Sequence, residues 1–178
     1  MLQYRFEGLK ELVKGTDPVI LVEPLRKFFK SATVVVQGEA RYYAPSDTGH
    51  LRNMIVTEVD AGRPPIWGKV GVLKAEAGTP LWFKARAMEY GTGSQGDPEV
   101  SHKAGHWPPG DVLNRWAGRH GFGKDGGFAV AAAIGKRGGL KGRKYLRVGF
   151  ALSLDRIKGL LRQVPVDILK EWAKRVRG

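Results

Sequence analysis

The tripeptide Asp47-Thr48-Gly49 is the first candidate for chemistry, and it lies at the centre of the stretch "YYAPSDTGHLRNM". In aspartic proteases these residue types hold a catalytic aspartate on a loop after a hydrophobic strand, and two such carboxylates share one proton. Here the tripeptide follows an expected helix and Pro45, and no second Asp-Thr-Gly or Asp-Ser-Gly occurs. Only a homodimer would supply the second carboxylate. The sequence therefore favours a structural turn and predicts no enzyme activity.

The composition of the same stretch suits a compact junction between a helix and a strand. Asp47 can accept hydrogen bonds from backbone N–H groups two residues on in an Asx-type turn, and Gly49 tolerates a positive φ. Leu51 is expected to return the chain to the core. Arg52 is expected to meet a nearby carboxylate, and Glu89 is the predicted partner.

A second pattern resembles a nucleotide-binding loop but lacks one of its parts. The spacing Gly118-x4-Gly123-Lys124 matches such a loop up to its last position, where Asp125 replaces the hydroxyl that binds Mg²⁺. A phosphate-binding loop also leaves a buried strand and opens a helix, whereas this one follows the short helical pattern "LNRWAG". No nucleotide site is predicted.

A third pattern concerns metal binding. His102 and His106 have the spacing of two ligands on one helix face, with Asp97 and Glu99 upstream. Gly105 and two following prolines argue for a loop instead. The chain has no cysteine, which excludes disulfides, thiolate chemistry and cysteine-based zinc sites. We therefore expect no metal and no cofactor.

Length and composition indicate one folded domain of 178 residues with a net charge of +13. No apolar run approaches a membrane span, and the N-terminal stretch lacks the pattern of a secretory signal. The expectation is a soluble, intracellular product. The positive charge suits nucleic acid, an acidic protein partner or general solubility.

Part of that charge is concentrated in the stretch "KRGGLKGRK", residues 136–144, which we call the basic segment. It contains no acidic residue and three glycines, so a mobile loop is predicted rather than a helix face. We expect this loop to contact a partner through its five cations, which are Lys136, Arg137, Lys141, Arg143 and Lys144.

The element pattern predicts an α+β fold in a single domain, 1–178. It comprises a long N-terminal amphipathic helix and a C-terminal helix packed on a small, mostly antiparallel sheet. A loop-rich insert with short helices is expected at about 94–143. The long helix is predicted over 18–43, stopped by Pro45, because three-and-four spacing connects its apolar residues. These are Leu21, Leu25, Phe28, Phe29, Ala32, Val35, Val36, Ala40 and Tyr43.

Further elements follow from local patterns. Residues 54–62 and 66–74 are rich in β-branched residues and predict a hairpin. Residues 80–93 open like a strand, and 93–110 are expected to form a loop. Short helices are predicted over 111–121, capped by Asp111, and over 128–138. Residues 145–174 have helical spacing, and Pro165 is expected to divide them into two pieces.

A helix-turn-helix built from residues 111–138 would make this a basic DNA-binding or regulatory protein. The second helix, "AVAAAIG", is small and apolar, which suits burial rather than the reading of base edges. The basic residues are also compatible with non-specific contact with DNA phosphates.

Three stretches together resemble a tailed-phage family. "APSDTGHLRNMI" (residues 44–55) is similar to the signature Ala-Pro-x-Asp-Thr-Gly-x-Leu-Arg of neck and tail-completion proteins, the gene-product-ten-like head–tail joining proteins of lambda-like phages. "AMEYGT" (87–92) resembles the family's Glu-aromatic-Gly-Thr element, and "GRKYLRVGFALSL" (142–154) its late segment. The match covers residues 17–161, and the stretch 94–143 is longer than the corresponding stretch in the simplest members of the family.

The resemblance implies a structural virion protein at the head–tail junction or tail end: a neck, tail-completion or tail-terminator subunit. It implies a homo-oligomeric ring of six or twelve copies that docks adjacent connector and tail proteins and lets DNA pass without specific contact. The expected locations are the virion and, during assembly, the host cytoplasm; no membrane partner is expected. The residues expected to shape the motif turns are Pro45, Asp47, Thr48, Gly49, Leu51, Arg52, Glu89 and Gly91.

Overall fold

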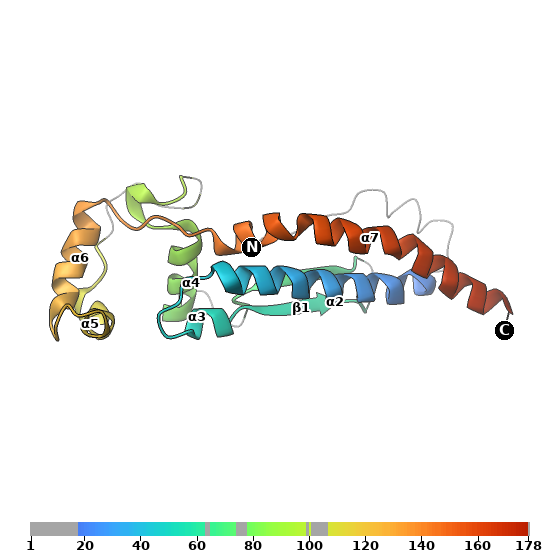
Figure 1. Ribbon diagram of the computed structural model, residues 1–178, viewed down its shortest axis with the longest axis horizontal. Coiled ribbons are helices and arrows are strands. Elements are labelled where there is room, and N and C mark those ends of the chain that lie inside the picture. The colour runs from blue at the N-terminus through green and yellow to red at the C-terminus, as the bar shows by residue number, and fades with distance from the viewer. Residues whose placement is uncertain (1–17, 63–64, 74–77, 99, 101–106, 178) are drawn as a thin grey trace. The chain divides into compact units, whose positions relative to one another are not determined.

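The computed structural model describes residues 18–62, 65–73, 78–98, 100 and 107–177, and it has an α+β fold (Figure 1). The chain divides into two compact units. Unit 1 comprises Met1–Ala75 and Tyr145–Gly178, and unit 2 comprises Glu76–Lys144. Unit 2 is longer than the expected insert at 94–143, because it also includes the helix α4 (Pro80–Tyr90).

The central element of unit 1 is α2 (Pro18–Tyr43), whose bounds are those predicted from the sequence. Its apolar stripe is buried at Leu21, Leu25, Phe28, Phe29 and Ala40. Because these positions recur every three or four residues, they share one helix face, which explains why the sequence alone places the helix. Asp17, whose side chain is expected to accept hydrogen bonds from the first backbone N–H groups of this helix, lies outside the described residues.

A two-stranded hairpin packs against α2. The strands β1 (Val56–Asp60) and β2 (Trp67–Gly71) are antiparallel, with Val56 opposite Gly71 and Asp60 opposite Trp67. This confirms the predicted hairpin. The strands touch α2 closely at Gly68, where a Cβ atom would meet the Thr33 Cγ2 at 2.7 Å.

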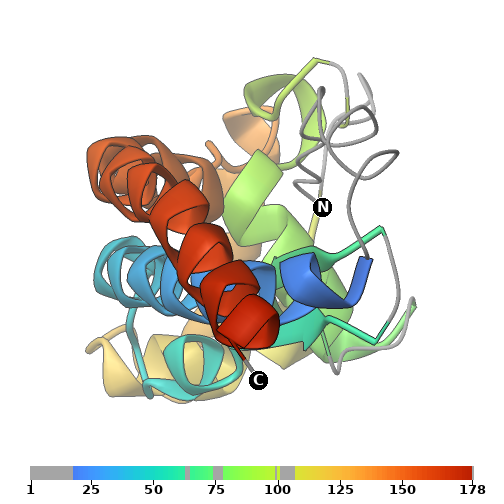
Figure 2. The ribbon, with the colours of Figure 1, turned by 90° about the vertical axis from the view of Figure 1, so that its right-hand side faces the viewer.

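The last element, α7 (Tyr145–Arg177), runs antiparallel to α2. Near its start, Gly149 approaches the backbone of Ala40, and further along Val164 joins the core cluster of Leu21 and Leu25. In the end-on view of Figure 2, α7 and α2 lie side by side, with the strands against α2. None of the helices in the described part of the chain is long and apolar enough to span a membrane.

The prediction that Pro165 divides the C-terminal segment is wrong, because α7 is one continuous helix with Pro165 inside it. A proline in a helix interior removes one hydrogen bond and usually bends the helix. Here the neighbouring Val164 is buried, and Ile157, Leu160 and Ile168 pack against the same core. Packing on both sides of the proline therefore holds the helix together.

Unit 2 begins with α4, where the expected strand-like opening is wrong. Thr79 caps this helix, since its hydroxyl accepts a hydrogen bond from the Trp82 N–H at 3.4 Å, and Pro80 occupies the first turn. The guanidinium of Arg86 lies 5.3 Å from the centre of the Trp82 ring and 5.7 Å from that of Tyr90, each four residues away. This spacing aligns all three side chains on one helical face.

The rest of unit 2 contains a short 3₁₀ turn, η1 (Gly93–Gln95), and two helices, α5 (Gly110–Arg119) and α6 (Gly126–Lys136). Both helices match predicted ones within two residues. Asp111 is not the cap: it lies in the first turn of α5, and Pro109 holds the cap position without a side-chain hydrogen bond.

Candidate docking surface

The signature stretch forms a tight junction between α2 and β1. The helix α2 ends at Tyr43, two residues before Pro45, as predicted. Gly49 has φ 75°, a left-handed conformation that favours glycine, and it precedes the single helical turn α3 (His50–Asn53). Leu51 in that turn is buried at 2% exposure, which confirms its expected return to the core.

Arg52 stabilises the end of α2. Its Nε donates to the carbonyl oxygen of Ala44 at 3.1 Å, and its Nη2 donates to that of Tyr42 at 3.3 Å. The last carbonyls of a helix lack partners within the helix and carry partial negative charge, so a guanidinium is well suited to them. The expected pairing of Arg52 with Glu89 stays a prediction.

The other end of the junction is also attached to α2. The carbonyl oxygen of Ile55 accepts hydrogen bonds from Gln37 Nε2 at 2.8 Å and from Arg41 Nη2 at 2.8 Å and Nε at 3.1 Å. The side chains of Asp47 and Thr48 lie exposed between these two anchored ends. Their surroundings are those of a surface turn, and the Asx-type turn itself stays a prediction.

In unit 2 the end of α4 pairs with the basic segment. Gly91 and Lys141 form an antiparallel bridge. The Thr92 N–H donates to the Leu140 carbonyl at 2.8 Å, and the Arg143 N–H donates to the Met88 carbonyl at 2.7 Å. The "AMEYGT" motif is thus hydrogen-bonded to residues 140, 141 and 143. These residues lie just before and at the start of the third motif, "GRKYLRVGFALSL".

Glycines permit this close pairing. Gly91 has φ 80°, and a Cβ atom there would lie 2.5 Å from the Leu140 carbonyl oxygen and 2.6 Å from the Gly142 nitrogen. A Cβ at Gly142 would in turn lie 2.6 Å from the Glu89 carbonyl oxygen. Glu89 itself is only 2% exposed. The glycines of the basic segment therefore allow backbone contact instead of mobility, and the expected mobile loop is corrected to a hydrogen-bonded strip.

Three of the five cations of the basic segment, Lys141, Arg143 and Lys144, project from this strip, whereas Lys136 ends α6 and Arg137 is its cap residue. All five are exposed, and none takes part in an ion pair between described residues. Lys144 has φ 53°, an uncommon conformation for a non-glycine residue, and its N–H donates to the Glu89 carbonyl at 3.1 Å. The backbone thus presents the positive charges at fixed points. They lie at Lys136, Arg137, Lys141, Arg143 and Lys144.

The two short helices α5 and α6 pack on each other through small residues. Gly110, Ala117, Gly127 and Ala131 are buried, and the Gly127 N–H donates to Asn114 Oδ1 at 2.9 Å. The Phe128 ring lies against Gly110, but most of its surface stays exposed because the contact is formed mainly by small side chains.

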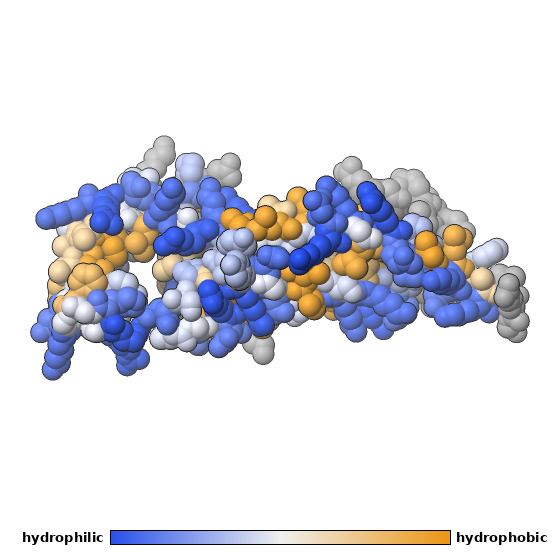
Figure 3. All heavy atoms as spheres, in the orientation of Figure 1, coloured by the Kyte–Doolittle hydropathy of each residue, from blue (hydrophilic) through white to orange (hydrophobic). Residues whose placement is uncertain are grey.

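This leaves an apolar surface that sequence reasoning missed. Phe128 is 62% exposed, and Val112 and Phe122 are also exposed. Apolar atoms gather over α5 and α6 in Figure 3. The signal was present in the sequence, since α6 has no charged side chain before Lys136 and is apolar on every face. Such a helix is ordinarily buried, so the surface suits contact with another protein.

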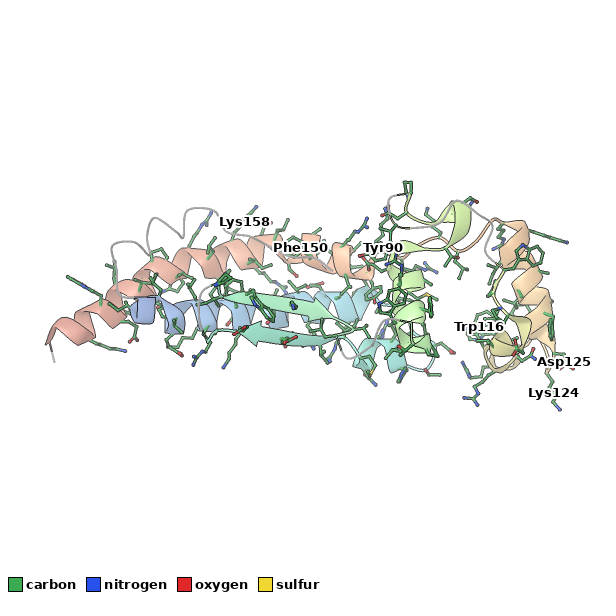
Figure 4. All side chains as sticks on the ribbon, turned by 180° about the vertical axis from the view of Figure 1, so that it is seen from behind. Tyr90, Trp116, Lys124, Asp125, Phe150 and Lys158 are labelled. Atoms are coloured by element: carbon green, nitrogen blue, oxygen red, sulfur yellow. The ribbon has the colours of Figure 1, made fainter. Side chains whose placement is uncertain are left out.

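The turn between α5 and α6 contains the loop that resembles a nucleotide site. Figure 4 labels Lys124 and Asp125 there, beside Trp116, and both charged residues are exposed. The turn follows a helix instead of a buried strand, as the sequence predicts. The rings of His120 and Phe122 stack on Trp116 at 4.1 and 5.9 Å between centroids, which fixes the turn by aromatic packing.

The described residues include no group of three or more His, Asp or Glu side chains that could hold a metal ion. His102, His106 and Glu99 lie outside the described residues. Comparisons with protein-family models, curated proteins and solved structures found no match to this chain.

Proposed function

We propose that the chain is a structural subunit of a closed ring at the head–tail junction or tail end of a tailed-phage particle, without catalysis. Support comes first from the signature residues 44–55. Arg52 donates to backbone carbonyls at the end of α2, and the Ile55 carbonyl accepts hydrogen bonds from the side chains of Gln37 and Arg41 on that helix. A residue set used to join elements fits a protein whose role is geometric.

The exposed apolar surface of α6 is the main support for the proposed ring. A helix that is apolar all round and packs mainly on one other helix within the described chain exposes surface that water disfavours. Contact with another molecule would cover that face. Side-by-side copies that bury such faces close into a ring when the contact repeats at a suitable angle.

The basic segment gives the second surface of the proposed subunit. Its cations are displayed by a hydrogen-bonded backbone, so an acidic surface on a neighbouring connector or tail protein would meet them with little loss of conformational entropy. DNA would pass the ring without specific contact, since a strongly adhesive channel would retard its movement.

The test neutralises Lys141, Arg143 and Lys144 together by substitution with glutamine. We expect the variant to fold and to form rings in native mass spectrometry, and to lose the salt-dependent attachment of heads to tails in a reconstitution assay. A matched control substitutes Lys27, Lys30 and Arg162, three exposed cations of unit 1, and should attach normally. Normal attachment of the first variant, independent of salt, would reject the docking role.

A basic DNA-binding or regulatory protein is the second candidate, favoured by the net charge of +13. Mobility-shift assays with duplex DNA distinguish the two. A DNA-binding protein should retard the duplex with a steep dependence on salt while staying monomeric. A ring subunit should oligomerise by itself or on meeting its partner.

A further inference from the structure

An apolar groove of about 230 Å³ opens in unit 1 between α2, β2 and α7. Aromatic and aliphatic side chains from all three elements form its walls, among them Phe29, Val36, Val70, Phe150, Leu154 and Leu161. On the wall formed by α7, Leu154 and Leu161 are each 37% exposed, so part of this wall is in contact with solvent. Figure 4 labels Phe150 and Lys158 on that helix.

The interior of the groove is mainly hydrocarbon. Where the hairpin touches α2, a Cβ atom on Gly68 would lie 2.7 Å from the Thr33 Cγ2 and 3.2 Å from the Phe29 Cδ1. The Thr33 hydroxyl serves its own helix, because it donates to the Lys30 carbonyl at 3.1 Å. The methyl group of Thr33 and the ring of Phe29 thus face β2. Such an interior favours a hydrocarbon chain, since a polar group buried there would need a hydrogen-bond partner.

The rim of the groove carries a positive charge. Of the lining residues that the structure describes, Lys158 is the charged one. It follows Leu154 by four residues and precedes Leu161 by three, so all three lie on one side of α7. The side chain of Lys158 is 63% exposed. A lysine placed in this way lays its methylene stem against the apolar wall and keeps its ammonium in water.

A second cation lies close to the same rim. Arg162 follows Lys158 by one turn of α7 and is also exposed. The Lys158 ammonium lies 3.3 Å from the Asp155 carboxylate, in an ion pair whose two side chains are largely exposed. An exposed pair of this kind is weak, so an added anionic group can compete with it. The charges at the rim therefore favour a ligand with a negative head group.

The size of the groove suits one short chain. A buried apolar cavity of about 150 Å³ accepts one benzene ring. By the same proportion, 230 Å³ suits a chain of roughly nine carbon atoms. An amphipathic helix of a partner protein spreads its apolar side chains over several turns, whereas this groove has the volume of a single chain.

We propose that the groove between α2, β2 and α7 binds a single-chain amphipathic anion, such as a medium-chain fatty acid. The hydrocarbon chain lies along Phe29, Val70 and Phe150. The carboxylate lies at the rim, beside Lys158 and Arg162. This inference does not rest on the proposed function.

Isothermal titration calorimetry of the full-length protein tests the ligand class. Hexanoate, octanoate, decanoate and dodecanoate are compared at concentrations at which each acid is monomeric. We expect the Kd to fall about four-fold for each added methylene up to roughly nine carbons and then to level off. Decyltrimethylammonium, which has the opposite charge, should bind roughly ten-fold more weakly than decanoate. Equal binding of these two ligands, or no binding of decanoate, would overturn the proposal.

A pair of lysine variants tests the head-group position. Lys158→Gln should weaken decanoate binding about two- to five-fold and leave the binding of uncharged decanol unchanged. The matched control is Lys170→Gln, which removes another exposed cation of α7 that is paired three residues back, with Asp167 at 3.9 Å. It should leave both ligands unaffected. Equal weakening by the two variants would show that the overall positive charge attracts the acid, and would overturn the proposal.

A pair of leucine variants tests the location. Leu154→Glu, at the rim, should abolish decanoate binding. Leu152→Glu changes a residue of α7 that is 53% exposed and outside the groove lining, so binding should persist. Nuclear Overhauser contacts from the decanoate chain should reach the methyl groups of Val36 and Val70. Contacts to α5 or α6 instead, or loss of binding in both variants, would overturn the proposal.

Two other occupants have distinct signatures. Sedimentation with anionic phospholipid vesicles, without binding of monomeric decanoate, would assign the groove to a membrane surface. Dissociation of an oligomer by Leu154→Glu, again without binding of decanoate to the unmodified protein, would assign it to a second copy. Either result would overturn the proposal. Head–tail attachment is a separate readout, so failure here is distinguishable from failure of the proposed function.

Discussion

Gly91 and Lys141 face each other across an antiparallel bridge, although they are far apart in the sequence. This bridge joins the end of α4 to the basic segment, and it explains why a glycine follows Glu89 and Tyr90. The backbones of residues 91 and 140–142 approach so closely that no side chain fits between them. The positions of the cations in the basic segment thus depend on Gly91, which lets the two backbones approach.

Gly91→Ala should destabilise unit 2 by at least about 3 kcal/mol, because the new Cβ meets two backbone atoms and the left-handed φ is strained. Gly123→Ala is the matched control. Gly123 has φ 77° with nothing within 4 Å of a Cβ, so only the conformational cost of about 1 kcal/mol applies. Chemical denaturation compares the two, and equal losses would show that the close approach is unimportant.

Arg52→Ala should lower the free energy of unfolding by about 1–2 kcal/mol, since the carbonyls of Tyr42 and Ala44 lose a charged donor. Arg52→Lys should recover part of this loss, because one ammonium cannot reproduce both bonds of the planar guanidinium. The control Arg26→Ala breaks only an exposed pair with Glu23 and should change stability by less than about 1 kcal/mol. Urea midpoints of unfolding measure all three variants. An unchanged midpoint for Arg52→Ala would show that Arg52 does not stabilise the end of α2.

Two glycines of α7 should respond to alanine with opposite signs. At Gly149 a Cβ would lie 2.5 Å from the Ala40 nitrogen, so Gly149→Ala must separate α2 from α7 at a cost of roughly 1–3 kcal/mol. At Gly159 nothing lies within 4 Å, and Gly159→Ala should stabilise by up to about 1 kcal/mol because alanine is the better helix former. Thermal denaturation of both variants tests the antiparallel contact, and shifts of the same sign would argue against it.

Lys174 should titrate above its ordinary value. A hydrogen bond from Lys174 to Glu171, at 2.8 Å, and the charge of that carboxylate raise the pKa of Lys174 from 10.5. A raised pKa means that the stabilising contribution is complete below the unfolded value and is lost as the pH rises through the folded one. NMR titration should place the pKa lower in Glu171→Gln, and an unchanged pKa would show that the pair does not persist in solution.

Elements whose signals are local were predictable from the sequence. The bounds of α2 follow from an apolar stripe, a first-turn proline and the stop at Pro45. The hairpin follows from two β-branched segments. In the junction, Gly49 has the positive φ, and Leu51 the buried position, that their residue types suggest.

Features set by distant contacts were not predictable. The continuity of α7 through Pro165 depends on packing against α2, and the pairing of the basic segment depends on α4. Glycine-rich composition is compatible with both mobility and close backbone approach, so it could not distinguish them. The hydrogen bonds from Arg52 to the carbonyl oxygens of Tyr42 and Ala44 were not predictable for a related reason, because no residue type reveals a carbonyl partner.

The contact of Val164 with Leu21 and Leu25 has a consequence for synthesis on the ribosome. Unit 2 is a continuous stretch, whereas unit 1 joins α2 to α7, which is translated after the whole of unit 2. Until α7 is made, α2 presents Leu21, Leu25 and Phe28 without their cover from Val164 and its neighbours. The nascent chain is therefore prone to aggregation during the synthesis of unit 2.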